Sequence, residues 1–276
     1  MTQDHTTEAP VCYRHPDRHT LLQCSRCGRP ICASCSIDAT VGQRCPECIR
    51  EEGLQKVIRP VRRPGSATIG APATRVFVAL SVFFYLVTSF GTFGDEIFVA
   101  LAQDNQAVAV GEWWRIFTVV LLHGSITHIL FNMWALWVLG PQVERGVGTW
   151  PFVSLYVAAA GVGGTAAYYF GGPFDVGVGA SGAIFGLFGI WLSWALHRRN
   201  TTYGRAVLNQ LGFLLLINAA LPFIFPGISW QAHLGGLIAG LAIGEVWAKI
   251  QGPRATALRT TVGFAVAALA VVTVSI

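Results

Sequence analysis

The sequence predicts an all-α polytopic membrane protein that is preceded by a small metal-binding module. Of the 276 residues, 53% are hydrophobic and only 12% are charged, whereas a soluble domain carries about a quarter charged residues. The mean hydropathy is +0.53. All seven cysteines lie before Pro60, and almost everything after Ala73 is apolar, aromatic or glycine. The chain is therefore expected to have two parts of different chemistry.

The first ten residues, "MTQDHTTEAP", contain neither a basic region nor an apolar region of the kind found in signal peptides. We expect no cleaved signal peptide, and an N-terminus in the cytoplasm. The net charge of +5 and the pI near 9.0 are typical of a membrane protein with basic cytoplasmic loops. No nucleic-acid partner is therefore expected.

The N-terminal module, residues 1–52, contains four pairs of metal ligands, each separated by two residues. The pairs are Cys12 with His15, Cys24 with Cys27, Cys32 with Cys35, and Cys45 with Cys48. Two such pairs fill one tetrahedral site, so the eight ligands predict two closed, structural Zn²⁺ sites. A disulfide framework is disfavoured, because seven cysteines are an odd number and no secretory signal precedes them.

The order in which the four pairs share two ions stays open in the sequence. An interleaved arrangement, first pair with third and second with fourth, resembles B-box and RING-like modules, while sequential pairing is also compatible with the spacing. His19 is a spare candidate ligand, which we interpret as a surface histidine. The module is too small to fold by core burial alone, so each ion should contribute on the order of 10 kcal/mol to folding.

Residues 53–73 are rich in proline, glycine and arginine, which predicts a linker that ends at the membrane surface. Seven apolar runs follow, at 74–93, 114–139, 150–170, 181–197, 206–225, 230–249 and 261–276. Their lengths suit a hydrocarbon core about 30 Å thick, although the fourth and the last are short. Six spans are expected in a core over 74–250, and a seventh helix follows a loop within 251–276.

Charge predicts the orientation of these spans. The segments "RPVRRP", "HRRNTTYGR" and "KIQGPRATALR" alternate with loops that contain no lysine or arginine. We therefore expect a multi-pass protein of the plasma (inner) membrane with the zinc module in the reducing cytoplasm. Ser181, at the start of the fourth span, is then expected in the extracytoplasmic half, and the C-terminus outside.

Four polar residues lie in or beside these spans: His128, Asn132, Ser181 and His233. Ionisable groups inside a membrane are functional-site hypotheses. Glycines at four-residue spacing follow both Ser181 and His233; they are Gly182, Gly186, Gly236, Gly240 and Gly244. Such spacing allows helix backbones to approach closely, so the fourth and sixth spans are expected to pack with Ser181 and His233 at matching depth. The alternative is that these glycines serve packing alone.

Four motifs together resemble the rhomboid family of intramembrane serine proteases over roughly residues 75–250. They are "WWR" (113–115), "HGSITHILFN" (123–132), "GASG" (179–182) and "AHLGGLIAG" (232–240). The resemblance implies a Ser-His dyad without a third acid, with Ser181 as nucleophile and His233 as base. It implies that His128 and Asn132 help to form the oxyanion hole, that Phe185 stacks on the catalytic histidine, and that a hydrophilic cavity open to the outside reaches the serine.

His123 is expected beside this cavity, or else is an interfacial histidine without a catalytic role, while Arg115 and Glu144 are expected to serve the structure. No cofactor is expected for catalysis. The implied function is an intramembrane endopeptidase whose partners are transmembrane protein substrates, the lipid bilayer and a cytoplasmic protein bound by the zinc module. The alternative function is a non-catalytic rhomboid-like binder or adaptor, which acts through the zinc module.

Overall fold

The computed structural model describes residues 9–39, 42–51, 70–224 and 227–276. The chain divides into two compact units, Met1–Thr68 and Ile69–Ile276. Most of the linker predicted at 53–73 lies outside the described residues, so its conformation stays a prediction.

The N-terminal unit is built from very short elements. They are β1 (Val11–Cys12), β2 (His15–His19), η1 (Ala33–Cys35), β3 (Ile37–Asp38), β4 (Gln43–Arg44) and α1 (Pro46–Glu51). β1 pairs with β2 and β3 pairs with β4, both antiparallel. Its buried cluster consists of six cysteines and Ile31, with Tyr13 packed against it. An apolar core of this size cannot stabilise a domain by burial alone. The remaining stabilisation must come from the cysteine groups.

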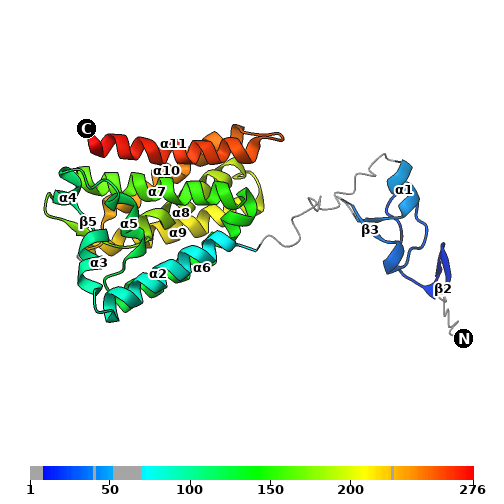
Figure 1. Ribbon diagram of the computed structural model, residues 1–276. Helices are drawn as coiled ribbons and strands as arrows, with labels where there is room; N and C mark the ends of the chain where they lie inside the picture. The colour runs from blue at the N-terminus through cyan, green and yellow to red at the C-terminus, as the bar shows by residue number, and fades with distance from the viewer. Residues whose placement is uncertain (1–8, 40–41, 52–69, 225–226) are drawn as a thin grey trace, which may run out of the picture. The chain divides into compact units, whose positions relative to one another are not determined.

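The second unit contains, within its described part, seven helices of 17 to 23 residues, which run alongside one another (Figure 1). They are α2 (Pro72–Phe90), α6 (Ile126–Val147), α7 (Thr149–Phe170), α8 (Ser181–His197), α9 (Thr202–Ile224), α10 (Trp230–Lys249) and α11 (Ala255–Ser275). α8 is buried along most of its length. The helical membrane fold expected from the sequence, a six-helix core with a seventh helix, is confirmed.

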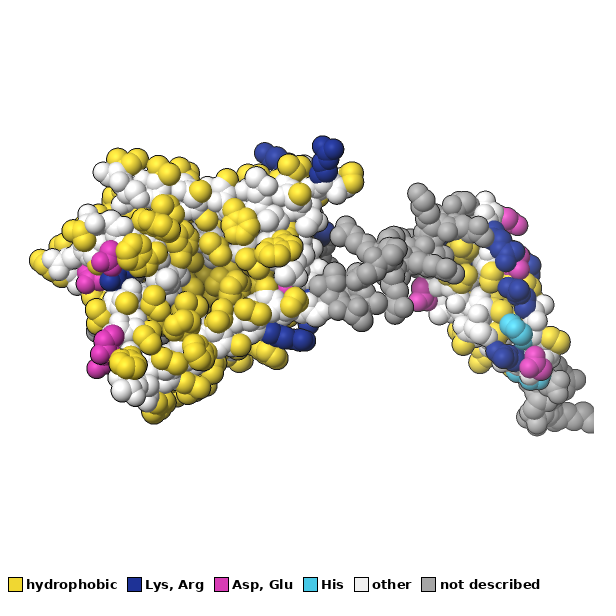
Figure 2. All heavy atoms as spheres, viewed as in Figure 1, with side chains coloured by type: hydrophobic (Ala, Val, Ile, Leu, Met, Phe, Trp, Pro, Cys, Tyr) yellow, Lys and Arg dark blue, Asp and Glu magenta, His cyan; other side chains and the backbone are white. Residues whose placement is uncertain are grey.

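Four of these helices, α2, α7, α9 and α11, are each long and apolar enough to cross a membrane by length and composition. A fifth candidate is α6 together with the short helical segment before it, if the bent pair is counted as one span. The side chains exposed on the surface of this unit are largely apolar, as Figure 2 shows. A surface of this kind suits contact with lipid chains rather than with water.

The predicted second span, 114–139, is wrong as a single helix. The structure has α5 (Arg115–Thr118) and η2 (Val119–Leu121), then a break, and then α6, which is bent by 95° from the first segment. Ser125 is extended and its hydroxyl accepts a hydrogen bond from the backbone N–H of His128 at 3.2 Å, so it caps a new helix. The prediction joined the apolar stretches on both sides of residues 123–128 into one span and so missed this helix start.

The seventh helix is longer than predicted, since it begins at Ala255 rather than at Thr261. The prediction started the helix too late because the charge of Arg259 indicated a loop. The Arg259 guanidinium donates hydrogen bonds to the carbonyls of Trp247 and Ile250, at 3.2 and 2.8 Å. These carbonyls belong to the C-terminal end of α10, where a cation is favoured.

Between α2 and α6 the chain forms α3 (Gly94–Leu101), β5 (Gln103–Asp104) and α4 (Asn105–Ala109). The buried Arg115 ties this segment together, because its guanidinium donates to the carbonyls of Val99 and Ala102, at 2.5 and 2.7 Å, and pairs with Glu112. β5 pairs antiparallel with β6 (Val176–Gly177), which lies just before Ser181. The segment is therefore anchored to the stretch that leads into α8.

Glu144, near the end of α6, is fully buried and acts as a cap for α2. Its carboxylate accepts hydrogen bonds from the backbone N–H groups of Ala73 and Thr74, at 3.0 and 2.9 Å, and from the Thr74 hydroxyl at 2.8 Å. The Thr149 hydroxyl adds a fourth bond, at 3.0 Å. The carboxylate thus satisfies amides that a helix start leaves without partners. The structural role expected for Glu144 is confirmed.

Candidate active site

Ser181 and His233 lie side by side in the structure. Ser181 is the first residue of α8 and His233 the fourth of α10, and the Ser181 Oγ is 2.8 Å from the His233 Nε2. The histidine is buried, whereas Ser181 is partly exposed. A hydroxyl at this distance can donate its hydrogen to the ring nitrogen, which is the arrangement that activates a serine.

Glycines set the spacing between the two helices that carry this pair. A Cβ atom on Gly236 would lie 1.9 Å from the carbonyl oxygen of Gly182, and one on Gly240 would lie 1.9 Å from that of Gly186. The backbones of α8 and α10 are thus in direct contact, in the manner of other small-residue helix pairs. The predicted close packing of these two spans is confirmed.

A third helix supports the same contact, and sequence reasoning missed it. A Cβ atom on Gly163 of α7 would lie 2.8 Å from the carbonyl oxygen of Ala232, directly before His233, and 3.6 Å from the Cα of Gly182. The signal was present in the sequence as small residues at 161, 163 and 164. α7 therefore sits against the starts of both α8 and α10.

The imidazole of His233 is held by packing and by the start of its own helix. The Phe185 ring, one turn after Ser181, stacks on it with centroids 4.2 Å apart and planes 10° apart. Ser229 caps α10, since its hydroxyl accepts a hydrogen bond from the N–H of Ala232 at 3.2 Å. Among the described residues, no hydrogen bond or ion pair joins His233 to a carboxylate.

The loop before Ser181 requires glycine at position 179. Gly179 has φ +127°, and a Cβ atom there would lie 2.7 Å from Cε1 and Nε2 of His128. Its N–H donates to the carbonyl of Val119 at 3.0 Å. The first glycine of "GASG" therefore lets the loop pass directly against the His128 ring. This contact places His128 beside the segment that leads into Ser181.

Asn132 and His123 lie near His128 but have no direct hydrogen bond to the serine. The buried Asn132 amide donates to the carbonyl of His128, one turn back, at 3.0 Å. The buried His123 ring lies edge-on to the His128 ring with centroids 5.1 Å apart. Within the described residues, neither Asn132 nor His128 is hydrogen-bonded to Ser181 through its side chain, so their oxyanion role stays a prediction.

The eight predicted metal ligands form two separate groups in the N-terminal unit. One group is Cys12, His15, Cys32 and Cys35, and the other is Cys24, Cys27, Cys45 and Cys48. In each group all four ligand atoms lie within 4.8 Å of one another. The grouping follows the interleaved order rather than the sequential one. His19 lies outside both groups, and its Nδ1 is 2.7 Å from the carbonyl oxygen of Ala9.

The distances within both groups fit a tetrahedral ion. The Sγ atoms of Cys12, Cys32 and Cys35 lie 3.7, 3.4 and 3.3 Å from the His15 Nδ1. In the other group, the Sγ atoms of Cys27 and Cys45 are 3.8 Å apart. A tetrahedron with zinc–sulfur bonds of about 2.3 Å has edges of about 3.8 Å between sulfurs. Both donor sets therefore have the size that Zn²⁺ requires.

Polar neighbours favour the deprotonated form of two of these thiols, Cys32 and Cys27. The Ser34 hydroxyl, 3.2 Å from the Cys32 Sγ, lowers the pKa of the Cys32 thiol to about 5. The Arg29 guanidinium donates to the Cys27 Sγ at 3.3 Å and lowers the pKa of that thiol. Arg29 also stacks over the Tyr13 ring, 4.8 Å from its centroid. Sequence reasoning missed Arg29, because one arginine among the six in residues 1–52 carries no signal of its own.

Comparison with known proteins agrees with this geometry. Residues 110–250 match the model of the Rhomboid domain family. The rhomboid protease GluP of Bacillus subtilis (strain 168) is 36% identical over 195 residues, which cover 70% of this chain and 37% of GluP. The rhomboid protease GlpG of Salmonella choleraesuis (strain SC-B67) is 30% identical over 194 residues, 68% of this chain and 69% of GlpG.

A plant relative, the RHOMBOID-like protein 5 of Arabidopsis thaliana, is 33% identical over 152 residues, 52% of this chain and 47% of that protein. The chain thus spans less than half the length of GluP and of the plant protein, and about two thirds of GlpG. The matching family model, these relatives and the helical architecture agree: the chain belongs to the rhomboid family of membrane proteins.

Proposed function

We propose that this chain is an intramembrane serine endopeptidase that hydrolyses peptide bonds in or next to the transmembrane segments of membrane-anchored proteins. The observation that carries the proposal is the 2.8 Å contact between the Ser181 Oγ and the His233 Nε2. The contact lies where the backbones of α8 and α10 touch at glycine residues. The relatives of this chain are named rhomboid proteases, which also supports the proposal.

In the proposed reaction, His233 accepts the proton of Ser181 at Nε2 while the Oγ attacks the scissile carbonyl carbon. The imidazolium then returns this proton to the leaving amine, and an acyl ester on Ser181 remains. Water, deprotonated by the same nitrogen, hydrolyses the ester and restores the serine. The stacked Phe185 ring holds the imidazole in place of the acid that a triad would use.

The negative charge on the attacked carbonyl oxygen needs nearby donors. Ser181 lies in the first turn of α8, whose N–H groups have no acceptor within the helix, and the helix dipole favours an anion there. We assign the further donors to the Asn132 amide and the His128 ring. His128 already lies against Gly179. To donate to the oxyanion, the Asn132 amide would have to break only its hydrogen bond to the His128 carbonyl in its own helix.

We also propose that the dyad opens to the extracytoplasmic side. Of the nine lysines and arginines in residues 70–276, eight lie near the end where α2, α9 and α11 begin and where α6, α8 and α10 finish. On the face that Figure 2 shows, most of the Lys and Arg side chains of this unit lie at one end and most of the Asp and Glu side chains at the other. The end rich in basic residues is expected in the cytoplasm, whereas Ser181 stands at the opposite, starting end of α8.

For the N-terminal unit we propose two structural Zn²⁺ ions, one in each of the two ligand groups. Four protein ligands close each site, so the ions would cross-link the unit and leave no position for a substrate. The unit would then face the cytoplasm, where thiols stay reduced and a protein partner is accessible.

Cleavage by a matched set of variants tests the proposed reaction. The protein is reconstituted in lipid vesicles with a transmembrane substrate, and Ser181→Ala and His233→Ala are compared with Ser193→Ala. Ser193 lies on the same helix, but its hydroxyl donates to Glu245 at 2.7 Å. We expect cleavage by the wild type and Ser193→Ala only. Cleavage by Ser181→Ala would refute the proposal, and substrate binding without cleavage by the wild type would favour the non-catalytic alternative.

A further inference from the structure

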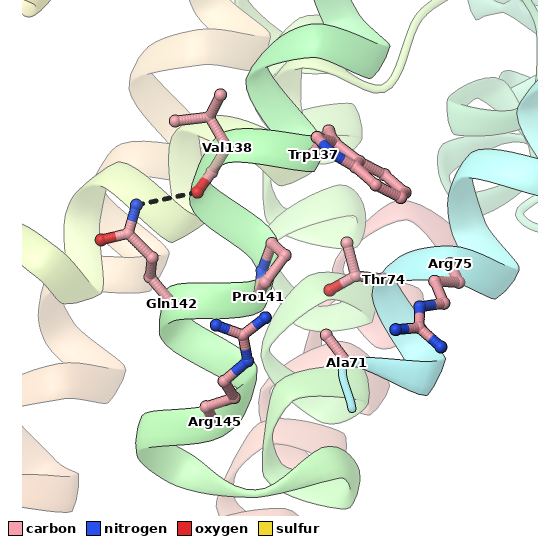
Figure 3. A pocket seen from close by; sticks show the side chains of 8 residues that line it. All are labelled: Ala71, Thr74, Arg75, Trp137, Val138, Pro141, Gln142 and Arg145. Atoms are coloured by element: carbon pink, nitrogen blue, oxygen red, sulfur yellow. Dashed lines mark hydrogen bonds between the residues drawn. The ribbon is translucent and has the colours of Figure 1, made fainter. Parts of the chain in front are cut away.

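A cavity of about 310 Å³ lies between the start of α2 and the last turns of α6, and the proposed reaction does not use it. It is at the basic end of the membrane unit, opposite to the end at which α8 begins with Ser181. Its lining includes Thr74 and Arg75 from α2, and Trp137, Gln142 and Arg145 from α6 (Figure 3). The cavity is thus a second feature of this unit, separate from the dyad.

Two arginines line this cavity, and neither has a side-chain partner among the residues that the structure describes. Figure 3 shows Arg75 on α2 and Arg145 on α6 on either side of it. In the part of the chain that the structure describes, no hydrogen bond or ion pair engages either guanidinium. Both side chains are exposed. Two unpaired guanidinium groups on one cavity form a site for an anion with oxygen acceptors, because their planar forks match phosphate.

The carboxylate of Glu144, beside Arg145 in the sequence, does not pair directly with either arginine among the described residues. Glu144 is fully buried, and both of its oxygens are occupied by the hydrogen bonds from Ala73, Thr74 and Thr149 described above. The amides of the α2 start are used in the same bonds, so they are not free for a ligand. The positive character of the cavity therefore comes from Arg75 and Arg145.

An exposed apolar strip leads from the cavity along α6 toward the membrane interior. Trp137, on the cavity wall, is followed one and two turns back by Trp134 and Leu130, and these three side chains are 58%, 65% and 60% exposed. Trp137 lies about 12 Å along the helix axis from Arg145, at 1.5 Å per residue. Tryptophan is enriched at the level of lipid headgroups. A ligand with a phosphate at one end and acyl chains at the other fits this arrangement, whereas free phosphate would leave the strip unused.

The geometry points to a binding site for an anionic phospholipid, whose phosphate lies between Arg75 and Arg145 and whose acyl chains follow Trp137 and Trp134 along α6. Two cationic groups facing one phosphodiester favour a lipid with net negative charge over a zwitterionic one. The site needs the protein to be embedded in a membrane, but it is independent of any chemistry at Ser181.

Lipid titrations of the purified full chain test the site. The protein in neutral detergent is titrated with phosphatidylglycerol, with phosphatidylcholine of the same acyl chains, or with inorganic phosphate. The unfolding temperature reports binding, because a ligand that binds only the folded state stabilises it by RT ln(1 + L/Kd), where L is the free ligand concentration. The variant is Arg75→Gln with Arg145→Gln. The control, Arg199→Gln with Arg254→Gln, removes the same charge from the same end of the unit but outside the cavity.

We expect phosphatidylglycerol to raise the unfolding temperature of the wild type and of the control, and to bind the Arg75/Arg145 variant about 30-fold more weakly. Phosphatidylcholine should bind weakly in all three. The proposal would be refuted if the two lipids bound equally well, or if the variant and the control lost the same affinity for phosphatidylglycerol. Either result would show only a diffuse electrostatic attraction. If inorganic phosphate alone raised the unfolding temperature as much as phosphatidylglycerol does, the site would bind a free anion and not a lipid. Since both arginines are exposed and unpaired, the unliganded variant should unfold at the wild-type temperature.

Discussion

The Phe185 ring lies parallel to the His233 imidazole at van der Waals distance, and the Ser181 hydroxyl reaches the Nε2 of the same ring. These two contacts fix the plane of the imidazole and the direction of one ring nitrogen. A triad would use a carboxylate to fix the tautomer, but no carboxylate contacts His233 among the described residues. At this site, packing therefore performs the orienting role that an acid performs elsewhere.

At the same scale, Asn132 should matter for rate and not for folding. We expect Asn132→Ala to lower kcat by about 10²- to 10³-fold, the usual effect of removing one oxyanion donor, with an unfolding temperature near that of the wild type. Asn218→Ala is the control, because the Asn218 amide makes the same bond to the carbonyl one turn back, to Leu214 at 2.8 Å. Equal rates for the two variants would remove Asn132 from the mechanism.

Residue types carried the most information about the candidate site where they are rare in membranes. Ser181 and His233 stood out because a histidine inside a span has few structural uses, and the structure brings them together. Gly179 was recognisable as part of a motif, but its contact with His128 was not, since the loop path depends on a neighbouring helix. The resemblance implied an oxyanion role for Asn132, which stays a prediction, since in the structure its amide donates to the carbonyl of His128 in the same helix.

The helices α8 and α10 form the element on which the dyad depends. The predicted bounds, 181–197 and 230–249, agree with the structure, because glycine spacing and apolar length both mark these spans. The second span was wrong because the apolar stretches on both sides of residues 123–128 were taken as one helix, although the structure starts a new helix after Ser125. Only the Gly-Ser pair at 124 and 125 marked the new helix start.

Gly240→Ala tests whether the contact between these helices supports catalysis. The new Cβ would lie 1.9 Å from a backbone oxygen of α8, so the helices must separate. We expect loss of cleavage and a free energy of unfolding lower by about 1 to 3 kcal/mol. The control is Gly212→Ala on α9, where a Cβ meets nothing within 4 Å.

In Gly212→Ala, cleavage should be retained and stability unchanged or slightly raised, since alanine favours a helix over glycine by about 1 kcal/mol. Unfolding of both variants in detergent and their cleavage rates in vesicles provide the comparison. If Gly240→Ala behaves like Gly212→Ala, the close approach of α8 and α10 is not what positions the dyad.

The whole molecule joins two units with separate sources of stability. The membrane unit buries an extended apolar core, whereas the N-terminal unit buries mainly cysteines. Sequence spacing was sufficient to single out the eight residues that the structure gathers into two groups, because chelation favours two-residue gaps. The interleaved grouping required the structure, since spacing alone allows both orders.

Metal removal should separate the two units functionally. We expect the purified protein to contain two Zn²⁺ per chain, and a chelator to release both and unfold the N-terminal unit, as limited proteolysis would detect. Cleavage of a transmembrane substrate should change by less than about twofold, since closed sites take no part in catalysis. Acidification should also release zinc, because protons compete for the thiolates and for His15.

Cys32→Ser should reduce the zinc content, while His19→Gln should leave it unchanged, since His19 belongs to neither ligand group. Loss of cleavage on chelation, while the membrane unit stays folded, would contradict the separation of the two units.

The central claim is that His233 makes Ser181 a nucleophile, and covalent labelling measures this most directly. The reconstituted protein is treated with a fluorophosphonate, which phosphonylates only activated serines, and the labelled peptide is identified by mass spectrometry. The account predicts labelling at Ser181 in the wild type, none at Ser193 on the same helix, and loss of the label in His233→Ala. Labelling of Ser181 at the wild-type rate in His233→Ala, or no labelling of Ser181 in a protein that cleaves its substrate, would contradict it.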